Sequence, residues 1–305
     1  MAEGQTLLSL LKELENMPEY KLLGRIRHFR TSLAIFHGNY QELIHHLKIH
    51  NDIKVSLPLM DVNKRQDLHA YQIEITRFLH NYIASSFSLI EHARNHYKEL
   101  YLTNGKFTDY QIEIDNRFTN NSLAVFIKDF RQYLQHYTLP GLSTRLNFSK
   151  DANDFEMTIR IPLRSLKIFS GWHSLAKKYI ASFTDDINLI QLVQQYHEHI
   201  EGFYTWFVKR QNEIHAEDFD KIKSIQNKIR AIKMKYFMEG LMIKNQTVSN
   251  FEYNFFELYP EEQTVLIKKE MNIEKRINGI LLLLNLETNF TKEMAESIKE
   301  IYNRK

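Results

Sequence analysis

The chain has 305 residues, of which 43% are hydrophobic and 25% charged, and this balance excludes a largely disordered protein. The formal charge is only +3 and no long run of lysine or arginine occurs, which argues against a dedicated duplex-DNA binder. Cysteine is absent, so disulfides, thiolate metal sites and cysteine nucleophiles are excluded, and a cytoplasmic protein is expected.

Residues 1–62 are expected to form N-terminal helices. Leucines at helical spacing mark one apolar stripe near the start, and a second stripe of aliphatic and aromatic residues runs from Leu33 to Leu47. Pro18 and Pro58 interrupt this segment.

The strongest helical pattern covers residues 64–101. Apolar residues recur there at helical spacing over about ten turns. Asn63 and Gln66 have the spacing of an N-terminal capping pair. Asn104 and Gly105 predict the end of the helix.

A second helix is expected over residues 122–139, ended by a Pro-Gly pair. Together with the preceding long helix it makes a helical hairpin over residues 63–141. Residues 142–162 then predict a β-hairpin, because apolar and polar residues alternate through residues 155–161.

Helices resume over residues 163–305, which are expected to pack on the same body. Within this region the pattern predicts helices at about 217–239, 261–286 and 291–303, the last capped by Thr291. The fold class expected is mainly α: a helical bundle with long antiparallel helices and one small β-hairpin insert.

Most familiar site motifs are missing. There is no phosphate-binding glycine-rich loop and no zinc-protease, serine-hydrolase or EF-hand pattern. His45-His46 and His197-Glu198-His199 place imidazoles one or two positions apart, on different sides of a helix, so neither group alone can hold an ion. We therefore expect no metal and no cofactor. The longest aliphatic run, residues 280–284, is far below the ~20 residues of a membrane span, so no membrane association is expected.

One pattern suggests chemistry: Arg131 and His136 form an Arg-x4-His motif near the end of the 122–139 helix. Two other arginine–histidine pairs have related spacing, Arg30/His37 and Arg210/His215. The spacing alone therefore does not identify a catalytic site, and the surrounding sequence has to be considered.

The stretch from His69 to Tyr137 resembles the HEPN family (higher eukaryotes and prokaryotes nucleotide-binding), whose members are compact helical bundles with an Arg-x4-6-His motif near the end of a late helix. Residues 126–136 look like that helix, although Gln132 stands where family members usually carry Asn, Asp or His. The resemblance covers about a quarter of the chain. It implies a metal-independent endoribonuclease in bacterial stress or defence, with RNA as substrate and a homodimer or partner protein completing the site.

The helical wheel adds a geometric requirement. At about 100° per residue, Arg131 and His136 lie on opposite flanks of the apolar stripe, about 140° apart. One straight helix would not bring both to a single phosphate, whereas two copies meeting across the polar face would.

In such a shared cleft, His136 would take the proton of a ribose 2′-OH and Arg131 would neutralise charge on the phosphoryl oxygens. Gln132, Tyr133 and Tyr137 are the expected substrate-binding residues, the tyrosines by stacking on bases. Two other interpretations stay open: a non-catalytic helical scaffold that binds protein or nucleic acid, and a ligand sensor with a pocket lined by aromatic residues between 196 and 207.

Overall fold

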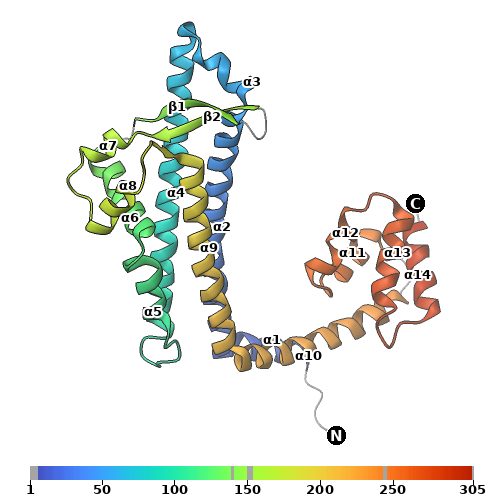
Figure 1. Cartoon of the computed structure of the whole chain (residues 1–305). Helices are drawn as coiled ribbons and strands as arrows, with labels where there is room; N and C mark the ends of the chain where they lie inside the picture. Colours follow the sequence, from blue (N-terminus) through green and yellow to red (C-terminus); the bar gives the residue numbers. More distant parts are fainter. Residues whose placement is uncertain (1–5, 139–140, 150–153, 243–245, 304–305) are drawn as a thin grey trace. The chain divides into compact units, whose positions relative to one another are not determined.

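The computed structural model describes residues 6–138, 141–149, 154–242 and 246–303, and helices dominate it, as the sequence predicts (Figure 1). Packing divides the chain into two units. The central unit is Gly24–Ala216, and the terminal unit combines Met1–Leu23 with Glu217–Lys305. This division differs from the four expected segments, because the apolar side chains on either side of Ala216 are buried in different clusters.

Three long helices form the body of the central unit: α2 (Pro18–Asn51), which belongs to this unit from Gly24 on, α4 (Arg65–Leu100) and α9 (Leu189–Ile214). They lie side by side in Figure 1. Apolar residues spaced three or four apart give each helix a face that is buried against the others. The core between them is rich in aromatic rings, including fully buried Phe36, Tyr82, Tyr196, Phe203 and Phe207.

The start of α4 differs from the prediction. Lys64 occupies the N-cap and makes no side-chain bond there, so the expected Asn63–Gln66 capping pair is wrong. The Asp61 carboxylate instead accepts a hydrogen bond from the Asn63 backbone N–H at 2.8 Å, in the 3₁₀ turn η2 (Val62–Lys64). Before it, α3 (Ile53–Ser56) and the 3₁₀ turn η1 (Leu57–Met60) connect α2 with α4.

The predicted end of α4 is confirmed. The helix ends at Leu100, whose carbonyl accepts a hydrogen bond from the Asn104 side chain at 2.7 Å. Gly105 follows with φ 63°, a left-handed conformation that glycine adopts without steric cost.

Beside α4 lies α6 (Ser122–His136), which packs against α8 (Ser174–Ala181). α5 (Tyr110–Ile114) and the π-helical turn η3 (Asp115–Thr119) precede α6, and α7 (Leu163–Lys167) precedes α8. α6 is shorter than the predicted helix 122–139, with Tyr137 as its C-cap, and residues 139–140 lie outside the described part of the chain.

The predicted hairpin is present as β1 (Ser143–Ser149) and β2 (Asp154–Ile161), paired antiparallel with Leu146 opposite Met157. A third strand, β3 (Ile187–Asn188), is not predicted from the sequence and pairs with the end of β2. A strand of only two residues is too short to show a periodic pattern in the sequence, so β3 could not be predicted and forms because it pairs with β2.

In the terminal unit, α1 (Leu7–Asn16) packs against α10 (Ala216–Leu241) through a small apolar cluster. Lys221 of α10 adds an ion pair to Glu19 at 3.0 Å.

A second cluster of the terminal unit joins α11 (Val248–Phe256), α12 (Glu261–Lys269), α13 (Ile273–Leu284) and α14 (Lys292–Asn303) to the end of α10. α11 is not predicted.

Side-chain caps set the starts of the last two helices, α13 and α14. The predicted single helix 261–286 is wrong, because the Asn272 side chain accepts a hydrogen bond from Lys275 N at 3.0 Å and starts a new helix. The predicted Thr291 cap is confirmed by its bond from Met294 N at 3.3 Å. Among the described residues, none of the helices combines the length and apolar character that crossing a membrane demands.

Candidate functional site at the end of helix α6

Hydrogen bonds hold both the first and the second half of α6 in place. Asn121 caps its start by accepting a hydrogen bond from Ala124 N at 3.0 Å. Further along, the buried Asp129 carboxylate accepts one from the His173 backbone N–H at 2.6 Å, which ties α6 to the start of α8. The buried rings of Phe126 and Trp172 also stack, with centroids 5.5 Å apart. The helix end that carries the Arg-x4-His motif therefore has a defined position within the central unit.

Arg131 lies half-buried between α6 and α4. Its guanidinium carbon is 4.8 Å from the centre of the Phe87 ring, a cation–π distance. Its Nε is enclosed and has no hydrogen-bond partner. Among the described residues no carboxylate pairs with Arg131, whereas Arg117, Arg160, Arg210, Arg230 and Arg276 each form an ion pair.

His136 is the last residue of α6 and its side chain is exposed. It has no hydrogen bond or ion pair with any residue in the described ranges. Five positions along a helix separate it from Arg131 by a rise of about 7.5 Å and a rotation of about 140°. Arg131 faces α4 while His136 faces solvent, so a single copy does not bring the two side chains to one point.

The three expected substrate-binding residues are placed differently from one another. Gln132 is exposed on the outer side of α6. Tyr133 is only 1% exposed, and its ring packs against the Trp172 ring with the centroids 5.8 Å apart. Tyr137, in contrast, is 52% exposed. The expectation that Tyr133 stacks on a base is therefore corrected, because core side chains cover its ring, and only Tyr137 offers an accessible ring.

A surface hollow of about 340 Å³ adjoins this helix end. Its lining comes from the end of α6, the segment before β1, and α7 with its C-cap, namely Tyr133, Tyr137, Thr138, Gly141, Ser165 and Ile168. Burial raises the pKa of the Tyr133 hydroxyl, and a hydrogen bond with Ser165 partly offsets that effect. Ser165 and Ile168 are absent from the sequence prediction, since no local pattern shows that α7 folds back beside α6.

The second Arg-x4-His pair has a structural role. Arg210 forms ion pairs with Asp109 at 3.1 Å and Glu213 at 3.0 Å. His215 is buried, with its Nε2 3.1 Å from the Tyr101 hydroxyl. These contacts account for both residues without a substrate.

The aromatic residues between 196 and 207 belong to the core. Tyr196, Phe203, Tyr204 and Phe207 are each at most 2% exposed and contact other rings of the central unit. None of these four residues lines either of the two hollows described in this subsection, so neither hollow corresponds to the pocket of the sensor interpretation.

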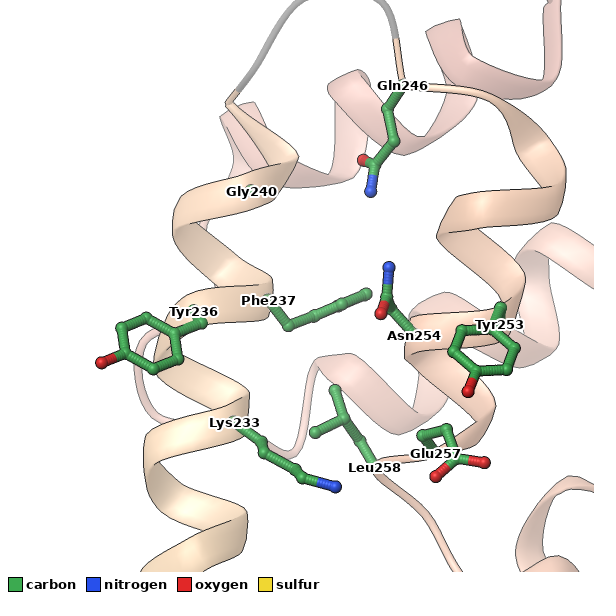
Figure 2. Close-up of a pocket in the computed structure, with 9 residues that line it drawn as sticks. All are labelled: Lys233, Tyr236, Phe237, Gly240, Gln246, Tyr253, Asn254, Glu257 and Leu258. Carbon is green, nitrogen blue, oxygen red and sulfur yellow. The ribbon is translucent and has the colours of Figure 1, made fainter. Parts of the chain in front are cut away.

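Another hollow, of about 320 Å³, lies within the terminal unit between α10 and α11. Figure 2 shows the amide side chains of Gln246 and Asn254 pointing toward each other across it, with Lys233 and Glu257 near its other end. The Gln246 Oε1 has no hydrogen-bond partner. No sequence motif falls on this hollow.

Comparisons of the chain with protein-family models, with curated proteins and with solved structures found no match.

Proposed function

We propose that this protein is a HEPN-like, metal-independent endoribonuclease in which two copies share one cleft built from the α6 ends. The observation that carries the proposal is Arg131, a half-buried arginine held over Phe87 with no carboxylate partner among the described residues. A guanidinium without a protein anion can bind a phosphate through its two terminal nitrogens, with the paired geometry that lysine lacks. The role proposed in bacterial stress or defence rests on the family resemblance.

In the proposed reaction, neutral His136 takes the proton from a ribose 2′-OH, and the 2′-oxygen attacks the adjacent phosphorus. The bond from phosphorus to the 5′-oxygen breaks, and His136 of the second copy protonates that leaving oxygen. Arg131 stabilises the charge on the phosphoryl oxygens. The products are a 2′,3′-cyclic phosphate and a 5′-hydroxyl. Tyr137, exposed at the rim of the neighbouring hollow, stacks on a base.

The experiment is RNA cleavage by the purified chain in EDTA. Arg131→Ala and His136→Ala are each expected to abolish cleavage. Two matched controls should leave it unchanged: Arg77→Ala removes an arginine that also lies over a ring, that of Phe78, but is paired with Glu74, and His69→Ala removes an exposed histidine. Cleavage that survives in both site variants would remove the assigned site.

The shared cleft makes a separate prediction about mixtures. Adding an equal amount of the Arg131→Ala/His136→Ala double variant places half of the wild-type chains in mixed pairs, so wild-type activity should fall to about half. Copies that act independently would show no change.

A second function, a non-catalytic helical scaffold for RNA or protein, is favoured by one observation: within a single copy Arg131 faces Phe87 while His136 faces solvent. This function predicts no cleavage under any condition, with RNA or partner retention unchanged in Arg131→Ala and His136→Ala.

A further inference from the structure

A cluster of metal-ligating side chains lies between α2 and α9, away from the α6 end. His197 and Glu201 are one turn apart on α9, and His37 of α2 faces them. One nitrogen from each imidazole and one carboxylate oxygen all lie within 4.8 Å of one another. The distance from His197 Nε2 to Glu201 Oε2 is 4.0 Å. Positions four apart share a helix face, which is why His197 and Glu201 converge although adjacent residues do not.

His197 has the surroundings of a fixed ligand. It is 6% exposed, and the Tyr40 ring lies flat against it with centroids 3.5 Å apart and planes 6° apart. Phe36 also stacks against it, at 4.9 Å. These aromatic contacts hold the ring in one orientation, with Nε2 on the side of the Glu201 carboxylate.

The donor set selects the class of ion. Two imidazole nitrogens and one carboxylate oxygen match zinc and similar transition metals, whereas calcium and magnesium prefer oxygen ligands throughout. Zinc bonds of ~2.0–2.2 Å place tetrahedral ligand atoms about 3.4 Å apart, so the observed atoms need to close by about 1 Å. Glu201 is exposed and His37 only half-buried, so both side chains have room to do so.

We propose that His37, His197 and Glu201 bind one divalent transition-metal ion of the zinc type, which joins α2 to α9 within the central unit. The expectation of no metal considered only histidines one or two positions apart in sequence, and this site takes its third ligand from a helix distant in the chain. His199 is not one of the proposed ligands, because its Nε2 lies 2.6 Å from the Arg117 carbonyl oxygen. The proposed ion is structural and separate from the proposed ribonuclease, which works in EDTA.

The test uses the full chain, stripped with EDTA and then titrated with Zn²⁺ against a chromophoric chelator. One ion per chain is expected to bind, with a rise in the melting temperature. Co²⁺ as a second probe should give the visible absorption of a low-coordinate site with nitrogen ligands. His37→Ala and Glu201→Gln should each weaken Zn²⁺ binding by at least about tenfold.

Matched controls separate this site from the other histidines of the surface. His45→Ala and Glu198→Gln change exposed residues of the same types on the same two helices and should leave the affinity unchanged. His197 is not substituted, because its ring is part of the core. Absence of stoichiometric Zn²⁺ binding, or affinity unchanged in Glu201→Gln, overturns the proposal, and the exposed position of Glu201 makes that variant independent of folding.

Discussion

Asp129 carries a carboxylate into the interior of the central unit, where it accepts the His173 backbone N–H at 2.6 Å. Replacing it with alanine removes this partly buried hydrogen bond to a charged acceptor. We expect Asp129→Ala to lower the free energy of unfolding by about 1–3 kcal/mol. Urea unfolding followed by tryptophan fluorescence measures this, because both tryptophans, Trp172 and Trp206, lie in the central unit.

The control is Asp129→Asn, which keeps an acceptor oxygen of similar reach. It should cost clearly less stability than alanine does. Equal losses in the two variants would mean that side-chain volume, and not the hydrogen bond, is what matters at this position.

At the residue scale, the sequence predicts positions on a helix better than it predicts exposure. The helical wheel separates Arg131 from His136 by about 140°, and in the structure the first is half-buried over Phe87 while the second is exposed. Tyr133 and Tyr137 were expected to be equivalent, yet one is 1% and the other 52% exposed. The difference arises because Trp172, from the segment before α8, packs against Tyr133, and nothing local in the sequence reports that contact.

At the scale of elements, the start of α6 provides a direct test of capping. Asn121 accepts the Ala124 N–H at 3.0 Å, and Asn121→Ala should lower the free energy of unfolding of the central unit by about 1 kcal/mol. The neighbouring Asn120→Ala is a matched control, since Asn120 is exposed and its side chain caps no helix within the described residues. Tryptophan-detected urea curves for the two variants should differ, and coincident curves would contradict the cap.

Long elements follow from the sequence because their apolar stripes repeat over many turns, as in α4 and α9. Short ones do not. β3 exists through its pairing with β2, and the break between α12 and α13 depends on one cap at Asn272. The His37–His197–Glu201 cluster has a local half, the i,i+4 pair on α9, that the sequence carries. The remaining residue, His37, comes from α2 and reaches the pair only through the tertiary packing of α2 against α9.

At the scale of the whole molecule, the central unit buries histidines that it keeps neutral. Burial lowers the pKa of His50, His96 and His197 to about 4, below the ordinary value of 6.5. The unfolded chain therefore binds more protons between these values, and stability is lost as pH falls from about 6.5 toward 4. We expect the urea midpoint of the tryptophan signal to fall steadily from pH 7 to pH 5.

The variant His50→Phe isolates the contribution of His50 to this loss of stability at low pH. Both ring nitrogens of His50 are enclosed without partners, and its ring stacks on Tyr71 with centroids 5.2 Å apart, so a phenyl ring keeps the packing and removes the titration. The variant should gain more stability relative to wild type at pH 5 than at pH 7.5. A gain that does not vary with pH would assign the acid sensitivity to other groups.

The division into two units also separates their electrostatics. The central unit holds 23 basic and 19 acidic residues together with all 14 histidines, while the terminal unit holds 17 basic and 18 acidic residues and no histidine. Mild acidification thus adds positive charge to Gly24–Ala216 alone. A polyanion bound to the central unit would then release more counterions, and its binding would depend more strongly on salt concentration. Binding to the terminal unit would not change in this way.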